Sequence, residues 1–387
     1  MTGGGGGGVL RPPAALGVVG DGQLGRMFVQ AAQRLGYRAG CLAASADAPA
    51  ALVASWTVVG PPGHLPSLRK FAREAQGITV EFENVSAPAL RWLARNRPVR
   101  PGWRTVWISQ DRLREKAFLA SVGIPLAPWM PVRTEGELAA AVGEIGTPLI
   151  LKTAASGYDG KGQIRVDRPA EAAGAWAELR RVPCVAEGLV TFAAEVSAIV
   201  ARGADGQAVV YPVAWNRHRK HILDATTMPA PIGPVATQQA RALALAIADA
   251  LGTVGVLTVE FFLMVGGDLL VNELAPRPHN SGHLTMEAAV TGQFEQQVRA
   301  LCGLPLGDPG LTTPAAMVNL LGDLWASGEP SWDAALAADP GVKLHLYGKR
   351  TAAPGRKMGH LTVLDPDPEI ALARALAARA ALARGSS

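Results

Sequence analysis

The chain has 387 residues, of which 49% are hydrophobic and 18% charged, and its formal net charge is +5 at pH 7. This length favours two or three globular domains, and the composition excludes an intrinsically disordered chain. The basic residues are scattered rather than clustered with aromatic residues, so small anionic ligands fit this chain better than nucleic acid does.

Signals for membranes or secretion are not evident in the sequence. The first eight residues, mostly glycine, lack the basic and apolar regions of a signal peptide, and we expect a disordered leader. The longest apolar stretch, residues 242–265, contains Asp249 and Glu260, which argues against a membrane span. The three cysteines are odd in number and widely spaced, which predicts neither disulfides nor a zinc site and is typical of a cytoplasmic protein.

The first third of the chain alternates predicted strands and helices. We expect a strand at 16–19, a Gly-rich turn, a helix ending near 35, strands at 37–43 and 78–82, and a helix at 88–96. This order predicts parallel strands joined by crossover helices. The Pro-rich segment 97–102 indicates a linker.

The rest of the chain predicts two further units with the active cleft between them. The expected elements of the second are a helix at 110–122, a strand at 149–153, a Gly-rich loop at 157–162 and a strand at 163–166. Antiparallel strands are expected at 194–202, 208–214, 255–263 and 268–274, with a helix at 237–251. Short strands at 342–347 and 359–364 and an Ala-rich helix at 368–384 complete the prediction.

The first motif is a GxGxxG that follows a strand and opens a helix, Gly20-Asp21-Gly22-Gln23-Leu24-Gly25. Backbone N–H groups and the helix dipole favour an anion at such a turn. Three interpretations remain open: a nicotinamide dinucleotide site, a purely structural turn, and a phosphate site for a nucleotide monophosphate. The dinucleotide site requires an acidic residue about 20 positions further on, where only Asp47 is loosely placed.

A second motif combines a strand-end lysine with a glycine loop. Lys152 precedes the loop Gly157-Tyr158-Asp159-Gly160-Lys161-Gly162-Gln163. Such a loop can bring N–H donors and Lys161 over a polyphosphate, while Lys152 supplies a point charge. A Gly-rich hairpin with a solvated lysine is the alternative.

The third motif is a geometric one, in which Glu260 and Glu273 flank the pair Gly266-Gly267. If these glycines form a two-residue hairpin loop, the register places Glu260 directly opposite Glu273. Like charges opposite one another on a sheet are destabilising, so this pair predicts a divalent cation or a shared proton. Mg²⁺ bridging ATP phosphates fits two carboxylates, and a solvent-exposed hairpin is the alternative.

Two polar clusters follow. The run at 272–283 places Arg277, His279 and Asn280 in a turn without zinc spacing or an adjacent nucleophile, which favours anion recognition, whereas His283 is expected to be structural. The basic residues of 347–349 and 356–360 predict either a phosphate clamp or a solvated turn.

Together these motifs resemble the 5-(carboxyamino)imidazole ribonucleotide synthetase family of purine biosynthesis, whose members are ATP-grasp ligases. The matching strings are GQLGRM at 22–27, EFENV at 81–85, QDR at 110–112, GYDGKGQ at 157–163, NELAPRPHNSGH at 272–283, HLYGK at 345–349 and RKMGH at 356–360. They occur in the family's order, and the match runs from about residue 16 to 365, which makes it far more specific than a lone glycine motif.

The resemblance implies an α/β ATP-grasp fold and the ATP-dependent carboxylation of 5-aminoimidazole ribonucleotide with bicarbonate through carboxyphosphate. The implied units are a leader over 1–15, a Rossmann-like domain over 16–108, a small lobe over 109–190, a large lobe over 191–310 and a β-rich C-terminal domain over 311–387. ATP and Mg²⁺ are the implied cofactors, and a homodimer that binds neither nucleic acid nor membrane is the implied state.

The resemblance also implies the site residues. The implied ATP site consists of Arg112, Lys152, Gly157, Tyr158, Asp159, Gly160, Lys161, Gly162, Gln163, Glu187, Gly188, Leu189, Val190, Glu195, His218, Asn272 and Glu273. Glu260 and Glu273 become magnesium ligands. The ribonucleotide and bicarbonate would contact Gln23, Leu24, Glu81, Tyr158, Asp159, Arg277, His279, Asn280, Lys349, Arg356 and Lys357. In catalysis Lys152 and Arg277 would neutralise phosphoryl charge, and Asp159 or Glu81 would orient the amine or take its proton.

Five positions depart from the family's common pattern: Asp21, Val80, Ala154, Trp215 and Leu284. The added charge at Asp21 and the arginine absent at Ala154 predict altered substrate affinity rather than another reaction. Two alternative functions stay open at this point. A nicotinamide-dependent oxidoreductase would use the GxGxxG but leave residues 150–360 unexplained, and a catalytically silent relative would bind nucleotide without turnover.

Overall fold

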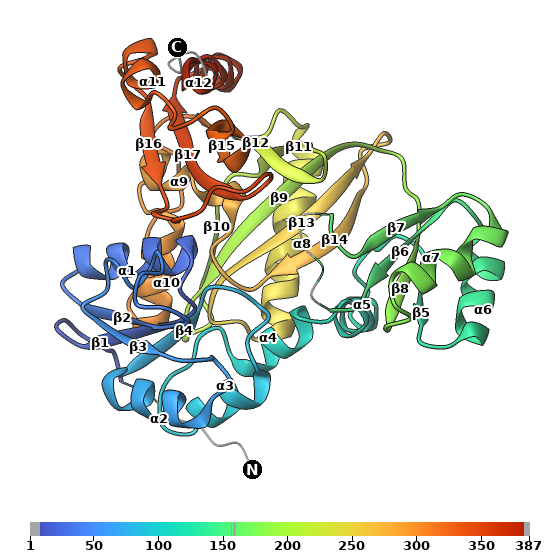
Figure 1. Ribbon diagram of the computed structural model, residues 1–387, viewed down its shortest axis with the longest axis horizontal. Helices are drawn as coiled ribbons and strands as arrows, with labels where there is room; N and C mark the ends of the chain where they lie inside the picture. The colour runs from blue at the N-terminus through green and yellow to red at the C-terminus, as the bar shows by residue number, and fades with distance from the viewer. Residues whose placement is uncertain (1–7, 156, 158–159, 383–387) are drawn as a thin grey trace.

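The computed structural model describes residues 8–155, 157 and 160–382. Figure 1 shows an N-terminal unit in blue, a small lobe in green and a C-terminal unit in orange and red around a central sheet. The small lobe extends to one side of the strands drawn in yellow and light green, and the N-terminal and C-terminal units lie on the other side of those strands.

The N-terminal unit is a parallel sheet with strand order β3-β2-β1-β4. Its elements are β1 (Ala15–Val19), α1 (Gln23–Arg34), β2 (Arg38–Ala43), β3 (Trp56–Val59), α2 (Leu65–Glu74), β4 (Gly77–Val80) and α3 (Ala87–Leu93). Strands β1 and β4 are fully buried, as helix-covered parallel strands require, whereas the edge strand β3 is partly exposed. The prediction of parallel strands with crossover helices is therefore confirmed.

Two linker helices, α4 (Trp103–Ser109) and α5 (Arg112–Ser121), lead into the small lobe. This lobe contains an antiparallel sheet of order β5-β8-β6-β7. Its elements are β5 (Trp129–Val132), α6 (Glu135–Ile145), β6 (Leu149–Thr153), β7 (Gln163–Val166), η1 (Pro169–Glu171), α7 (Ala172–Glu178) and β8 (Cys184–Gly188). A small core around Leu149, Leu151 and Trp176 holds α6 and α7 against the sheet.

The central sheet has nine strands and runs without a break from the large lobe into the C-terminal unit, because β12 pairs with β15. The large-lobe elements are β9 (Phe192–Arg202), β10 (Ala208–Val210), β11 (Ala214–Arg219), β12 (Ile222–Met228), α8 (Pro234–Leu251), β13 (Gly255–Met264), β14 (Leu269–Ala275), η2 (Asn280–Gly282), α9 (Thr285–Ala288) and α10 (Gln293–Cys302). The C-terminal elements are β15 (Ala315–Leu321), η3 (Gly322–Trp325), α11 (Trp332–Ala338), β16 (Lys343–Leu346), β17 (Lys357–Leu364) and α12 (Pro368–Leu382).

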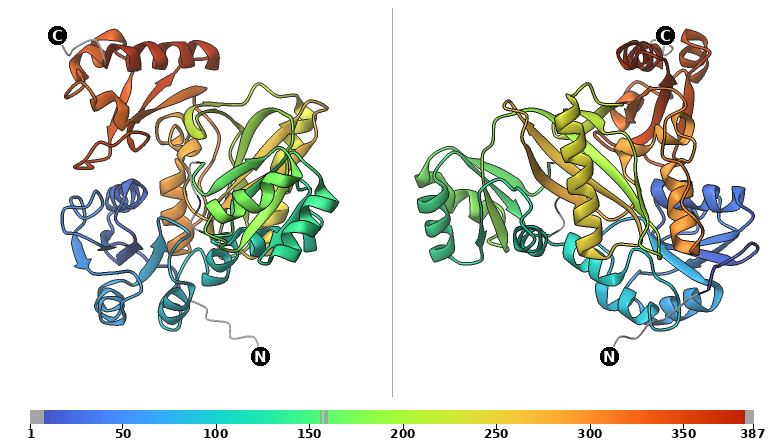
Figure 2. Two further views of the ribbon diagram at one scale, coloured as in Figure 1. Left: turned by 45° about the vertical axis from the view of Figure 1, so that its right-hand side comes forward. Right: turned by 180° about the vertical axis from the view of Figure 1, so that it is seen from behind.

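Helix α8 covers the back of the central sheet, as the rear view in Figure 2 shows. Ala236, Ala240 and Ala244 lie one turn apart on the buried face of α8 and belong to the core that contains β9 and β13. Small side chains at this spacing let the helix approach the strands closely. The opposite face carries a second apolar core around Ile199 and Val256 and, further along β9 and β13, the polar residues Glu195 and Glu260.

The strand expected at 208–214 is wrong in extent. Strand β10 ends at Val210 and β11 begins at Ala214. Pro212 lies between them, and because proline has no backbone N–H it cannot continue the ladder. The sequence also did not predict β11 as far as Arg219 or β12 at all.

Candidate active site

The hairpin β13–β14 places Glu260 directly opposite Glu273, which confirms the predicted pairing. The predicted two-residue loop is wrong. The Met264 backbone N–H donates to the Asp268 carbonyl over 2.8 Å, which encloses a three-residue loop. A register shift between Glu260 and Phe261 makes up the difference and leaves Asn272 unpaired on β14. The longer loop and this β-bulge offset each other, so the two carboxylates still face one another.

Each facing carboxylate has a cationic or ionisable partner. Glu260 Oε1 lies 2.9 Å from His279 Nε2, and Glu273 Oε2 lies 2.9 Å from Arg112 Nη2. Burial acts to raise the pKa of Glu260, but His279 and the nearby charges lower it below its ordinary value. Glu260 is therefore held as a buried carboxylate anion, ready to bind a cation.

Further donors surround Glu260. His218 Nδ1 lies 3.0 Å from Glu195 Oε1, and one donor atom each from Glu195, His218 and Glu260 lie within 4.8 Å of one another. The buried Oδ1 of Asn272 has no hydrogen-bond partner among the described residues. Carboxylate and amide oxygens are the ligands that Mg²⁺ prefers. Among the described residues, the group of side chains that could hold a metal contains Glu195, His218 and Glu260, whereas Glu273, which pairs with Arg112, is not part of it.

Lys152 and Glu187 form a buried ion pair in the small lobe. Strands β6 and β8 pair Ile150 with Glu187 and Lys152 with Val185, which makes Lys152 and Glu187 diagonal neighbours on one face. Lys152 Nζ donates to Glu187 Oε2 over 2.8 Å. Although burial acts to raise it, the pKa of Glu187 is lowered to about 2 by the neighbouring lysine charges.

The glycine loop touches the large lobe. Gly160 has φ +76°, and a Cβ at this position would lie 2.5 Å from His221 Cβ in the turn between β11 and β12. Gly162 has φ +73°, and its Cβ would lie 2.6 Å from Thr153 Oγ1. Only glycine satisfies both the backbone and the space at these positions. The predicted site residues Tyr158 and Asp159 lie outside the described residues.

Arg277 binds a glutamate that the sequence analysis did not select. Arg277 Nε donates to Glu83 Oε2 over 2.8 Å, and the charge of Arg277 lowers the pKa of Glu83 against the effect of burial. Both side chains are only partly exposed. His279 Nδ1 lies 2.9 Å from Ser281 Oγ, while the Asn280 amide exchanges two hydrogen bonds with Asn319.

The glycine turn is occupied by a side chain of the protein itself. Glu81 Oε1 accepts the N–H groups of Asp21 and Gly22 over 2.8 and 2.6 Å, and Oε2 accepts that of Gly25 over 2.6 Å. Burial raises the pKa of Glu81 despite these donors. The anion that the turn attracts is therefore a carboxylate. Asp21 points elsewhere, because its Oδ2 accepts the Ala44 N–H.

Other predicted residues lie around this centre. Gln23 and Leu24 form the half-buried start of α1, and exposed Leu189 follows β8. In the C-terminal unit Lys349 Nζ donates to the Lys357 carbonyl, and exposed Arg356 donates to the Thr351 carbonyl. The positive charge of Lys357 acts to lower the pKa of both Glu260 and His218. The C-terminal unit thus contributes to the same polar region.

Sequence reasoning also missed two buried residues of α5. Glu115 Oε2 accepts the Leu274 N–H, and Lys116 Nζ lies 3.0 Å from Glu187 Oε1. Burial, partly opposed by the Arg112 charge, raises the pKa of Glu115 to about 8. Their i+3 and i+4 spacing from Arg112 was the available signal, because such positions share a helix face.

The five departures from the family pattern are accommodated structurally. Val80, Ala154 and Leu284 are buried in apolar surroundings, and Trp215 packs against the core of the large lobe. His283 is also buried, and its Nδ1 lies 3.1 Å from Gln293 Nε2, as expected for a structural histidine.

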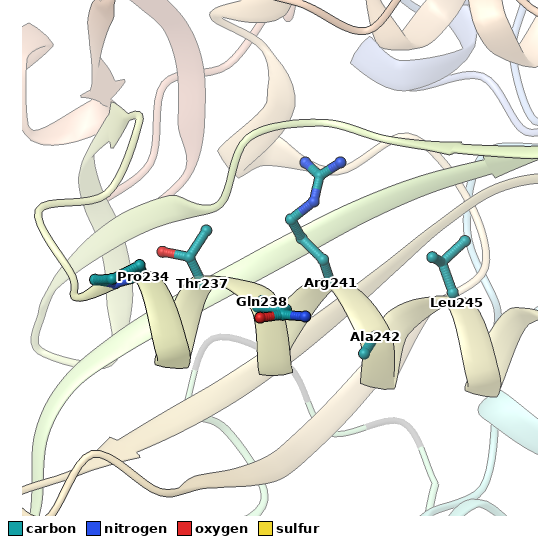
Figure 3. Close-up of a pocket in the computed structure, with 6 residues that line it drawn as sticks. All are labelled: Pro234, Thr237, Gln238, Arg241, Ala242 and Leu245. Atoms are coloured by element: carbon teal, nitrogen blue, oxygen red, sulfur yellow. The ribbon is translucent and has the colours of Figure 1, made fainter.

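A shallow depression on the outer face of α8 has a volume of about 430 Å³ and is lined by Pro234, Thr237, Gln238, Arg241, Ala242 and Leu245 (Figure 3). Its one charged group, Arg241, donates to the carbonyls of Val210 and Tyr211. This surface offers no carboxylate or imidazole for chemistry.

Among the described residues, no helix is long and apolar enough to cross a membrane.

Comparison with known families assigns three segments of the chain. Residues 14–110 match the ribonucleotide synthetase preATP-grasp domain, residues 117–294 the ATP-grasp domain, and residues 315–374 the phosphoribosylaminoimidazole carboxylase C-terminal domain. The N-terminal match gives no support to a nicotinamide-dependent oxidoreductase, and the ATP-grasp fold expected from the sequence is confirmed.

Individual relatives agree with this assignment. The N5-carboxyaminoimidazole ribonucleotide synthase of Bacillus subtilis is 41% identical over 93% of this chain and 94% of its own length. The Staphylococcus aureus N5-carboxyaminoimidazole synthetase complexed with ADP superposes with a TM-score of 0.89 at 34% identity, covering 96% of this chain and 99% of that one. The Aspergillus clavatus enzyme with ADP and 5-aminoimidazole ribonucleotide gives 0.85 at 29% identity, covering 96% and 99%. The chain therefore belongs to the N5-carboxyaminoimidazole ribonucleotide synthase family.

Proposed function

We infer that this chain carboxylates 5-aminoimidazole ribonucleotide with bicarbonate, converting ATP to ADP and phosphate. The observation that carries the proposal is the facing pair Glu260 and Glu273, which is surrounded by the side chains of Arg112, His218 and His279. The names of the relatives supply the substrate and product, since one is a carboxyaminoimidazole ribonucleotide synthase and another was solved with ADP and the ribonucleotide.

The chemical difficulty lies in bicarbonate, which is a poor electrophile. In the proposed first step a bicarbonate oxygen attacks the γ-phosphorus of ATP, the bond to the β,γ-bridging oxygen breaks, and ADP and carboxyphosphate form. Lys152 and Arg277 neutralise charge on the transferring phosphoryl group. Glu260 and Glu273 would hold Mg²⁺, which would supply further neutralisation at the ATP phosphates.

In the second step the exocyclic amine attacks the carboxyl carbon of carboxyphosphate, or of CO₂ released from it. Phosphate leaves with the electrons of the carbon–oxygen bond, and the amine loses a proton. Carboxyphosphate is short-lived in water, so the loop at 157–163 is proposed to cover it. The approach of Gly160 to His221 supports this role, because it brings the glycine loop of the small lobe against the turn between β11 and β12 of the large lobe.

Ribonucleotide binding is proposed for the N-terminal and C-terminal sides of the cleft. Gln23 and Leu24 begin α1 beside the glycine turn, and Lys349, Arg356 and Lys357 carry the positive charge that a phosphate requires. We assign Glu81 an indirect role, because three backbone N–H groups already occupy its carboxylate. Asp159 remains the proposed residue that orients the amine.

The proposal is tested by ADP release from the purified chain with Mg-ATP and bicarbonate, with and without the ribonucleotide. Strong stimulation by the ribonucleotide is expected, and omission of bicarbonate should remove it. ATP binding without turnover under all these conditions would identify a catalytically silent relative. We also propose a cytoplasmic homodimer, which light scattering tests by giving twice the mass of one chain.

A further inference from the structure

The buried carboxylate of Glu187 lies between two lysines rather than one. Lys152 Nζ is 2.8 Å from Oε2, and Lys116 Nζ is 3.0 Å from Oε1. The lysine side chains are 10% and 1% exposed and the glutamate side chain 4%, so solvent screens these charges little. These three side chains carry two positive charges and one negative charge, and the charge of Arg112 on α5 also acts on both Lys152 and Glu187.

The two lysines reach Glu187 from different elements. Lys152 and Glu187 lie on neighbouring strands of the small lobe, whereas Lys116 lies on α5. Figure 1 shows α5 between the small lobe and the central sheet, and α5 contacts both β8 and β14. Arg112 on the same helix binds Glu273 of β14. Helix α5 therefore connects Lys152, which is proposed to bind the ATP phosphates, to β14, the strand that carries the proposed magnesium ligand Glu273.

The two contacts differ in kind. Lys152 makes an aligned hydrogen bond to Glu187, whereas Lys116 is close but poorly aligned and has no hydrogen-bond partner among the described residues. When ATP binds, the proposed role of Lys152 requires its charge to turn toward phosphate. A buried carboxylate that lost its only partner would be strongly destabilised. Lys116, which lies beside Oε1, would still neutralise the Glu187 carboxylate after Lys152 has turned away from Oε2.

We propose that Lys116 is a positioning residue that serves as the permanent counter-ion of Glu187 and thereby frees Lys152 to bind the ATP phosphates. This inference rests on the proposed ATP site. Burial lowers the pKa of Lys152, and the charge of Lys116 contributes in the same direction while Glu187 opposes it. This agrees with a lysine pair that shares a single carboxylate.

The variant Lys116→Met removes the second cation and leaves Lys152 paired with Glu187 in a neutral group. We expect the dissociation constant for Mg-ATP, measured by calorimetry without bicarbonate or ribonucleotide, to rise about tenfold or more. The KM for ribonucleotide should change little. Arg114→Met removes a cation from the same helix outside this group, where Arg114 stacks on Trp107, and should leave ATP affinity unchanged.

A double-mutant cycle separates this role from simple packing. In the Glu187→Gln background Lys152 is no longer held by a carboxylate, so Lys116→Met should weaken Mg-ATP binding far less than it does in the parent. An equal loss in both backgrounds, or no loss in either, would overturn the proposal. Lys116→Gln, which keeps a polar end group, repeats the test if the methionine variant does not fold. If neither variant folds, Lys116 is a stability residue and the proposal is wrong.

Mg-ATP binding by the parent protein distinguishes failure of the proposed function from failure of the proposed Lys116 role. If the parent does not bind Mg-ATP, the proposed function fails, and the Lys116 inference fails with it. If the parent binds Mg-ATP and the Lys116 variants bind it equally well, only the counter-ion role is overturned.

Discussion

The substitution Glu81→Gln tests whether Glu81 acts through the glycine turn or directly on the substrate. The Glu81 carboxylate accepts three backbone N–H groups, two at Oε1 and one at Oε2. A glutamine amide has the same size but only one accepting oxygen, so its NH₂ group must face a backbone N–H of the turn. The variant also removes the negative charge at the N-terminus of α1.

The expected cost follows from these contacts. Losing a hydrogen bond to a charged acceptor costs about 1.5–3 kcal/mol, and removing an anion from a helix N-terminus costs about 0.3–1 kcal/mol. We therefore expect the free energy of unfolding of the N-terminal unit to fall by roughly 2–4 kcal/mol. The melting temperature should fall, the KM for ribonucleotide should rise, and Mg-ATP affinity should be unchanged.

The matched control is Glu83→Gln, two residues further along the chain. Glu83 binds Arg277 and, among the described residues, makes no side-chain hydrogen bond to the turn, so this variant should lower activity with a smaller effect on stability. The assays are denaturant unfolding and steady-state ADP release on both variants. A Glu81→Gln protein with parental stability and a kcat reduced by about a hundredfold or more would refute the reasoning, because it would indicate direct proton transfer by Glu81.

Three further predictions concern other parts of the molecule. Glu273→Gln should abolish bicarbonate-dependent ADP release while the fold is retained, and full activity would remove the proposed metal role. Gly160→Ala forces a Cβ against His221 and should lower kcat/KM for ATP without changing the melting temperature; parental kcat/KM would contradict the predicted close approach. Burial holds the pKa values of His283 and His360 well below the ordinary value, with Lys357 and Arg277 adding to the effect at His283. Below about pH 6.5 the unfolded chain therefore binds more protons, and stability should fall by up to about 1.4 kcal/mol per pH unit for each histidine. Melting curves from pH 7 to 5 test this, and an equal slope in His360→Gln would contradict it.

The hairpin illustrates how far sequence reasoning reaches. The facing of Glu260 and Glu273 was predicted correctly from a wrong loop length, because a β-bulge at Asn272 compensates for the additional loop residue. Local pattern gives strand polarity and approximate ends, but it contains no signal for the register shift between Glu260 and Phe261 that leaves Asn272 of β14 unpaired. The correct pairing was thus obtained without the correct backbone geometry.

The two glutamates after β4 show a second limit. Glu81 and Glu83 are two residues apart in EFENV, so the sequence alone does not say which one is buried in the turn and which binds Arg277. That choice depends on how the chain leaves β4 at Val80. Likewise, the role of Lys116 depends on the placement of α5 against β8, a tertiary contact that helical spacing can suggest but not establish.

The central claim, phosphoryl transfer to bicarbonate at this site, is tested most directly with ¹⁸O-labelled bicarbonate. The reaction is run with Mg-ATP and 5-aminoimidazole ribonucleotide, and the released phosphate is analysed by mass spectrometry. If carboxyphosphate forms, the carbon–oxygen bond breaks in the second step, and each phosphate carries one oxygen from bicarbonate. Phosphate without the label would mean that bicarbonate does not attack ATP, and would contradict the account.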